Sequence, residues 1–231
     1  MQPIYVRTIK TTIILANKNQ QQAPVEEQQV NKTEAFFEKN KKAIMGTVIA
    51  LIVIVAGIIL LNNYYFGPRQ DKASTELAKA QEKFQAEQFD KALPLFQKVA
   101  DEYGSTDAGN LAQLYIGLCQ ANLGKWQEAV KALESFSTQD DKMISPAAEG
   151  ALGNAYANLN QLDKAVEHLK KAAKMADNNS LSPTFLVQAG EILESQGKKA
   201  DALKLYEEIK EKYFNSMQYQ TIDAYIERCK E

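Results

Sequence analysis

Hydrophobic positions divide the chain into a polar segment, one continuous apolar run, and a long region in which apolar residues recur at helical spacing. The apolar run extends from Ala43 to Leu61, and its 19 residues include no charged side chain. A helix of that length is roughly 28 Å long, which matches the hydrocarbon thickness of a bilayer. Aromatic residues typical of membrane interfaces flank it, Phe36-Phe37 before and Tyr64-Tyr65-Phe66 after. The pattern predicts one membrane-spanning helix.

The sequence around the run favours a retained anchor over a cleaved signal peptide. Forty-two residues precede the run, and no small-residue cleavage pattern follows it. Lys39, Lys41 and Lys42 lie directly before the run, whereas Arg69 and Lys72 are set back from its end. By the positive-inside rule, this distribution places the N-terminus in the cytoplasm and the larger C-terminal part on the far side of the membrane.

The segment ahead of the anchor has the composition of a disordered tail. Residues 16–34 include five glutamines and no aromatic residue, so they cannot bury enough surface to fold alone. We therefore expect a tail over 1–34, an anchor helix over 35–66 with its span at 43–61, and a linker over 67–72. Residues 1–15 are more apolar, which fits either a short strand-like or helical segment or sequence upstream of the true start codon.

After the anchor the chain repeats itself with a period of 36 to 37 residues. Each copy has an alanine, a large apolar residue four positions later and a small residue twelve positions earlier. The alanines are Ala92, Ala129, Ala165 and Ala202; the large residues are Phe96, Leu133, Leu169 and Tyr206; the small residues are Ala80, Gly117, Gly153 and Gly190. Gly124, Asn160 and Gly197 mark a turn in the last three copies, whereas Glu87-Gln88 stands there in the first.

This pattern resembles the tetratricopeptide repeat (TPR), a helix-turn-helix unit of about 34 residues. The resemblance implies an all-α chain in which a transmembrane helix precedes an α-solenoid of about four TPR units and a C-terminal capping helix. The solenoid would cover 73–214, with repeats at about 73–108, 110–144, 146–180 and 183–214, and the capping helix would cover 215–231. Ser145-Pro146 and Ser182-Pro183 would supply an N-cap and a first-turn proline to repeats three and four.

Charge and composition argue against nucleic-acid binding and against most enzymatic sites. The net charge is −2, with +3 over residues 1–42 and −5 over residues 62–231, so neither part has a basic footprint. The one histidine, His168, has no partner motif and is expected to be solvated. Cys119 and Cys229 would lie roughly 25 Å apart in stacked repeats, as free thiols, unless Cys229 pairs between chains. We expect no enzyme activity, no metal and no cofactor.

In TPR proteins the inner surface of the solenoid binds peptides through residues of the first helices. Carried over to this sequence, the candidate groove residues are Leu111, Leu114, Leu118, Asn122, Asn154, Asn158, Glu191 and Glu194, with small residues such as Gly150 between them. None is basic, so the clamp with which some TPR proteins hold the C-terminal carboxylates of chaperones is absent. The three asparagines would bond the backbone of an extended peptide whose side chains meet the leucines, or else face solvent or cap helices.

The combination of anchor and repeats resembles the YfgM family, ancillary subunits of the SecYEG translocon, in a Bacteroidetes-like form. The residues that carry the resemblance are Lys39-Asn40-Lys41-Lys42 and the segments FQKVADEYGSTDAGNLAQLYIGLCQANLGKWQEAV and YFNSMQYQTIDAYIER. It implies a single-pass protein of the bacterial inner membrane whose periplasmic TPR domain assists protein export and chaperone hand-over. Its partners would be translocon subunits, periplasmic chaperones or exported chains.

Two other functions remain open at this point. The chain could be a structural scaffold of another envelope complex, for outer-membrane assembly or secretion, or a TPR import receptor of an organelle. The absence of a carboxylate clamp argues against the import receptor.

Overall fold

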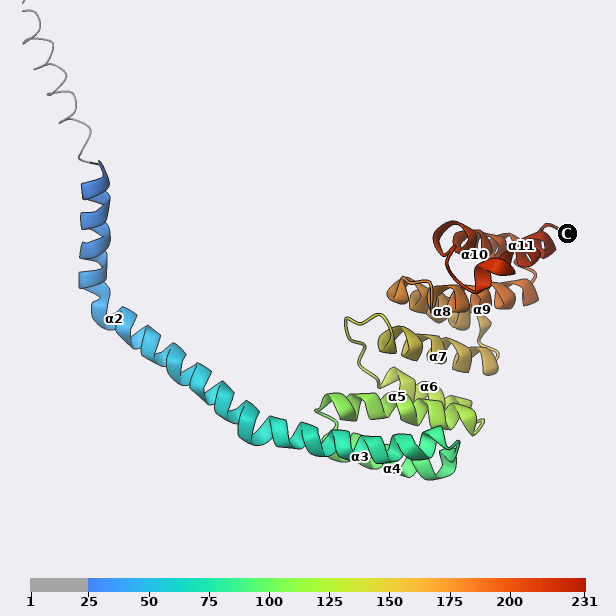
Figure 1. Ribbon diagram of the computed structural model, residues 1–231, viewed down its shortest axis with the longest axis horizontal. Coiled ribbons are helices and arrows are strands. Elements are labelled where there is room, and N and C mark those ends of the chain that lie inside the picture. Colours follow the sequence, from blue (N-terminus) through green and yellow to red (C-terminus); the bar gives the residue numbers. More distant parts are fainter. Residues whose placement is uncertain (1–24) are drawn as a thin grey trace, which may run out of the picture. The chain divides into compact units, whose positions relative to one another are not determined.

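The structure is a computed structural model that describes residues 25–231, with side chains from residue 35 onward. All regular elements of the described part are helices, as predicted, and the chain divides into two compact units at Tyr65 and Phe66 (Figure 1).

The first unit is built on one long helix, α2 (Val25–Leu61), followed by the π-helical turn η1 (Asn62–Phe66). The apolar side chains of α2 are exposed on all sides, as in Ile52 (61%) and Val53 (64%). A helix that is apolar all round has no favourable place in water, and α2 is long and apolar enough to cross a membrane. It begins inside the segment expected to be a disordered tail, whereas residues 1–24 lie outside the described part.

The second unit is a solenoid of helix pairs that stack in chain order (Figure 1). The pairs are α3 (Gly67–Gln85) with α4 (Phe89–Tyr103), α5 (Asp107–Asn122) with α6 (Trp126–Glu134), α7 (Ile144–Asn158) with α8 (Leu162–Ala176), and α9 (Ser182–Ser195) with α10 (Lys199–Lys212). The 3-10 helix η2 (Gln218–Gln220) and the capping helix α11 (Ile222–Lys230) follow. Residues 67–72, expected to be a linker, form the first turns of α3.

Each first helix ends in the same left-handed turn. The turn residues are Glu87, Gly124, Asn160 and Gly197, with φ of 56°, 72°, 58° and 73°. In the first repeat, the N–H of Glu87 donates to the carbonyl of Phe84 at 2.9 Å and that of Gln88 donates to the carbonyl of Lys83 at 3.0 Å. These two bonds form a Schellman cap, which satisfies carbonyls of the last helical turn. Glu87 therefore takes the glycine conformation without being glycine.

Polar side chains in the connections start the first helices of repeats three and four. Asp141 Oδ1 accepts from the N–H groups of Met143 at 2.8 Å and Ile144 at 2.5 Å, at the start of α7. Asn178 Oδ1 accepts from the N–H groups of Ser180 at 3.0 Å and Leu181 at 2.9 Å, at the start of α9. Both residues satisfy helix donors that would otherwise lack partners.

The prediction that Ser145 and Ser182 are N-caps is therefore wrong. Both serines are fully buried inside their helices. The Ser145 hydroxyl donates to Asp141 Oδ2 at 2.5 Å, and the Ser182 hydroxyl donates to the carbonyl of Ala173 at 2.8 Å. Burial alone would raise the pKa of Asp141, but these hydrogen bonds from Ser145 and from the helix backbone hold it below its usual value.

Small residues let the two helices of each repeat approach closely. A Cβ atom on Gly117 would lie 2.5 Å from Cγ of Leu133, and one on Gly190 would lie 2.4 Å from Cε1 of Tyr206. Carbon atoms do not approach so closely, so a larger residue at either glycine would force the helices apart. The pairing of small and large residues predicted from the repeat is confirmed.

Replacing Gly117 with alanine is expected to destabilise the solenoid by about 1–3 kcal/mol, because the added methyl group overlaps Leu133 in a packed core. Urea unfolding followed by circular dichroism measures the loss. In a matched double variant, Gly117→Ala with Leu133→Ala, the clashing side chain is absent. The double variant should lose less stability than the sum of the two single variants. Strictly additive losses would contradict a direct clash.

Replacing Glu87 with glycine is expected to stabilise the protein by about 1 kcal/mol, because a left-handed φ strains every residue except glycine. The inverse control is Gly124→Ala in the equivalent turn, where a Cβ would meet no atom within 4 Å and only the backbone is affected. Its stability should fall. Unchanged thermal unfolding in both variants would show that the backbone of this turn is not strained.

Candidate peptide-binding surface

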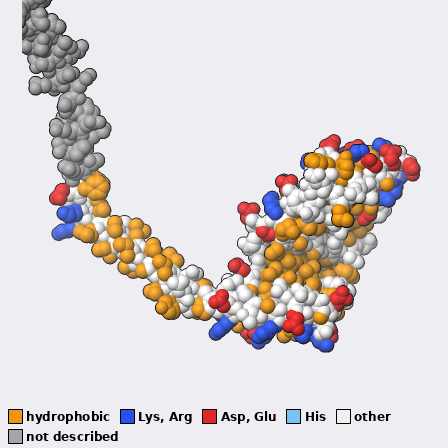
Figure 2. All heavy atoms as spheres, viewed as in Figure 1, with side chains coloured by type: hydrophobic (Ala, Val, Ile, Leu, Met, Phe, Trp, Pro, Cys, Tyr) orange, Lys and Arg blue, Asp and Glu red, His pale blue; other side chains and the backbone are white. Residues whose placement is uncertain are grey.

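Apolar side chains follow the first helix of the second repeat. Leu111 and Leu118 on α5 are half-buried and pack against the buried clusters around them, while Leu114 is only 6% exposed and belongs to the core. Figure 2 shows hydrophobic side chains gathered over the middle of the solenoid, at the level of α5 and α7. Leu111 and Leu118 thus combine a fixed position with partial exposure, which suits contact with an apolar ligand side chain.

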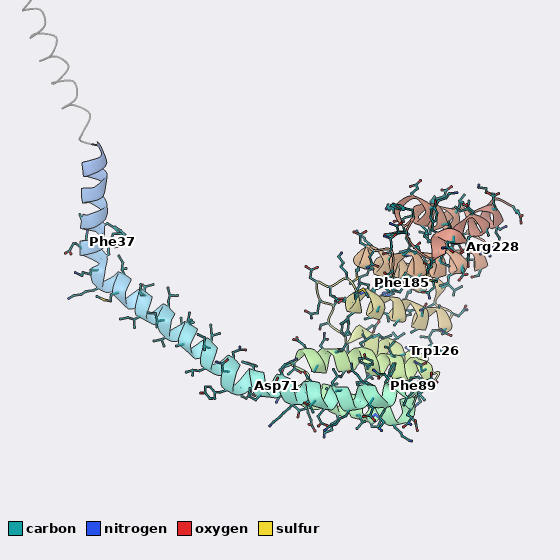
Figure 3. The ribbon with its side chains drawn as sticks, in the orientation of Figure 1. Phe37, Asp71, Phe89, Trp126, Phe185 and Arg228 are labelled. Carbon is teal, nitrogen blue, oxygen red and sulfur yellow. The ribbon has the colours of Figure 1, made fainter. Side chains whose placement is uncertain are left out.

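Repeats three and four contact each other where the aromatic ring of Phe185 packs on Gly150. A Cβ atom on Gly150 of α7 would lie 2.2 Å from Cε1 of Phe185 on α9, whose place is labelled in Figure 3. Gly150 is buried there, so it serves the packing of repeat four on repeat three. Ile192 on α9, absent from the predicted groove residues, is half-buried and contacts the clusters of both repeats. The sequence did not identify Ile192 as a surface candidate, because an apolar residue on a helix is equally compatible with a place in the core.

The three candidate asparagines differ in what their amides already bond. Asn122 Nδ2 donates to the carbonyl of Leu118 at 2.8 Å, and Asn158 Nδ2 donates to the carbonyl of Asn154 at 2.9 Å. Both amides therefore bond the last turn of their own helix, and their second N–H and their oxygen form no hydrogen bond with a described residue. The side chain of Asn154 is half-buried and has no hydrogen bond to any described residue. It is the amide most available to a ligand backbone.

The two candidate glutamates also differ. Glu194 accepts hydrogen bonds from the Tyr206 hydroxyl at 2.5 Å and from Arg228 Nε and Nη2 at 2.7 and 2.8 Å, so Arg228 ties α11 to α9 (Figure 3). Arg228 holds the pKa of Glu194 below its usual value, whereas burial and the nearby carboxylate raise the pKa of Tyr206. Glu191 is exposed and pairs with no cation among the described residues. Glu191 is therefore the carboxylate open to a ligand.

The expectation of a solvated His168 is wrong. Its Nδ1 lies 2.6 Å from Oε1 of Glu149, and its ring stacks on Tyr156 with centroids 5.1 Å apart. Glu149 is buried and also pairs with Lys171 Nζ at 3.0 Å. The Glu149 carboxylate comes from the preceding helix, 19 positions away, so no local motif could reveal it.

Cys119 and Cys229 are both buried, and neither forms a disulfide with another described residue. Burial raises the pKa of the Cys119 thiol to about 11 and also raises that of Cys229, so neither thiol is activated as a nucleophile. Within residues 35–231, no group of three or more His, Cys, Asp and Glu side chains is arranged to hold a metal ion.

Comparisons with known proteins agree with this architecture. No curated protein matches the sequence. The similar solved structures include the nearly identical TPR-like repeats of a putative kinesin light chain from Podosopora anserina, at 16% identity and a TM-score of 0.55, covering 69% of this chain and 86% of that one. The crystal structure of MamA matches at 16% identity and a TM-score of 0.52, and the match covers 68% of this chain and 89% of MamA. YrrB, a TPR protein with an unusual peptide-binding site, matches at 16% identity and a TM-score of 0.50, and the match covers 67% of this chain and 80% of YrrB.

At this identity the solved structures show the fold alone, and the family is shown by a sequence model. A model described as a tetratricopeptide repeat-like domain matches residues 34–224, which include the apolar run of α2 as well as the repeats. TPR proteins are typically interaction scaffolds without catalytic activity, and the fold indicates a module for binding other proteins. The chain belongs to the tetratricopeptide repeat-like domain family.

Proposed function

We propose that the chain is a membrane-anchored binding module that holds protein segments on the first helices of its solenoid. The observation that carries the proposal is the extent of the family match, which joins the apolar run and the repeats in one domain. The exposed apolar side chains of α2 support it, because they need lipid or protein cover. An anchor of this kind confines the binding surface to the membrane and raises its effective concentration there.

Ligand binding would use the surface residues that the fold leaves available. An extended peptide would bond the Asn154 amide through its backbone and place apolar side chains against Leu111 and Leu118. Glu191 would favour a segment with a basic residue near α9. Asn122 and Asn158 would contribute their remaining donor and acceptor groups. The binding energy would come from several modest contacts, which suits transient capture of many different chains.

The proposed location follows from charge next to the anchor. Lys39, Lys41 and Lys42 favour a cytoplasmic N-terminus, which puts the solenoid on the opposite side of the membrane. With the resemblance to the YfgM family, this topology supports a role at the bacterial inner membrane, where the solenoid would sit beside the Sec translocon and hand exported chains to periplasmic chaperones.

Site-specific photocrosslinking in living cells tests the binding surface. A photoreactive residue at Leu118 is expected to capture translocon subunits, chaperones or exported chains, whereas the same residue at Lys131, exposed on the second helix α6, should capture none of them. Combining the Leu118 probe with Asn154→Ala should lower the yield about three- to tenfold, because one ligand hydrogen bond is lost. The matched control Gln127→Ala, on the exposed face of α6, should leave the yield unchanged.

Three results would count against this function. Equal yields from Leu118 and Lys131 would exclude the first helices as the binding surface. An unchanged yield in Asn154→Ala would remove this amide from it. Exclusive capture of outer-membrane assembly or secretion components would favour the envelope scaffold.

Protease accessibility tests the topology. In spheroplasts, added protease should digest residues 70–231, while an N-terminal tag should remain protected inside the membrane-bounded cytoplasm. Protection of the solenoid together with loss of the tag would reverse the proposed orientation. A soluble cytoplasmic protein serves as the control for membrane integrity.

A further inference from the structure

The connections that lead from one repeat to the next lie along one edge of the solenoid. We call this the connection edge; it consists of residues 104–106, 135–143, 177–181 and 213–221 together with the first turn of α3. Hydrogen bonds join its neighbouring parts: Asp107 N–H to Gln70 Oε1 at 3.2 Å, Asn178 Nδ2 to the Lys142 carbonyl at 3.2 Å, and Gln218 Nε2 to Thr184 Oγ1 at 2.9 Å. The opposite edge, the turn edge, consists of the four left-handed turns.

Exposed apolar side chains of the solenoid gather on the connection edge. From α3 onward, the large hydrophobic residues that are exposed on or next to this edge are Met143 (57%), Ile144 (47%), Phe214 (61%), Met217 (85%) and Tyr219 (40%). The turn edge has only Leu123, at 38%, among the described residues. Side chains of this size are normally buried, and their concentration on one edge of a domain is typical of a surface that an apolar partner covers.

A short segment ties the end of the apolar run to the repeat-one end of this edge. Residues 62–66 are the only ones between Leu61 and the first residue of α3. Even fully extended, a segment this short spans no more than about 20 Å. Arg69, in the first turn of α3, donates to the carbonyl of Glu102 at the end of α4, so α3 begins where the second helices end. The tether therefore joins the solenoid at the connection edge and not at the turn edge.

We propose that the connection edge docks onto the lipid surface in which the apolar helix is anchored, with Met143, Phe214 and Met217 inserted at the headgroup level. Residues of this type partition into the membrane interface when they are held beside it, and Lys142 and Lys212 flank them with charges that can remain in water. Docking would hold the first helices upright on the membrane and leave their binding surface open. This inference rests on the membrane anchoring in the proposed function.

Lipid-quenched fluorescence of the full-length protein in phosphatidylcholine and phosphatidylglycerol vesicles tests the docking. An environment-sensitive fluorophore is attached to one introduced cysteine: Met217→Cys on the connection edge, Leu123→Cys on the turn edge, or Ile52→Cys in the apolar run. The native thiols are buried and should label little, which the unmodified protein checks. Lipids with a quencher near the headgroup should quench the Met217 probe strongly and the Leu123 probe weakly, also at high salt.

A second set of variants checks that the apolar side chains cause the docking. With a probe at Met143→Cys, the substitutions Phe214→Ser and Met217→Ser should lower the ratio of docked to undocked protein by roughly tenfold. Both side chains are exposed, so the fold should survive, and unfolding curves verify this.

The outcomes distinguish failure of the membrane anchor from failure of the docking. Quenching of the Ile52 probe by lipids with a deep quencher, with equally weak headgroup quenching at Met217 and Leu123, would overturn the docking and leave the anchor intact. Absence of any quenching at Ile52 would overturn the anchor, and the docking with it. Unchanged docking in the serine variants would overturn the assigned role of Phe214 and Met217.

Discussion

The close approach of the two helices within each repeat is the constraint on which the solenoid depends. Gly117, Gly153 and Gly190 stand opposite large side chains of the second helices, where a Cβ atom would clash, and Ala80 is fully buried at the equivalent place in repeat one. Repeats of this kind cannot bury an apolar face alone, since each one completes its core against its neighbours. If the two helices of one pair were forced apart at a glycine, the surface on which the next pair packs would therefore also be disturbed. The fully buried alanines, such as Ala92 and Ala165, reflect the same shortage of space.

This packing determines which polar residues are used for structural contacts and which remain exposed on the first helices. Residues that could have served a ligand by their chemistry, such as Glu194 and His168, are instead held by Arg228 and Glu149. These contacts attach the capping helix and join neighbouring helices. What remains on the first helices is a set of part-exposed leucines and the amide of Asn154, which forms no hydrogen bond with a described residue. In the proposed function such a surface would recognise backbone and apolar bulk, which fits a broad range of protein segments better than one exact ligand.

The length of the repeat separates the two edges of the solenoid. A unit of 36 to 37 residues exceeds the usual TPR length of about 34, and long connections at 135–143, 177–181 and 213–221 hold additional residues. There they supply the capping side chains of Asp141 and Asn178, and they also carry the exposed Met143 and Phe214. The turns at the other edge are short and closed by Schellman caps. If the chain is anchored as proposed, two such unlike edges would give the solenoid a physical basis for a fixed orientation on the membrane.

The amino-acid pattern alone predicts the apolar run, the all-α class, the repeat, its small-to-large pairs and three of the four left-handed turns. Each of these features follows from composition or from regular spacing. In a helix, such spacing directly produces an apolar face or a capped end. The folded chain was needed to show that Glu87 adopts the fourth left-handed turn, that Asp141 caps α7 where Ser145 was predicted, and that Glu149 contacts His168. It also brought Arg228 to Glu194, 34 positions earlier. The Glu149–His168 and Arg228–Glu194 contacts depend on how each helix packs against its neighbour, and no local pattern encodes that packing because it is set by all the side chains at the interface.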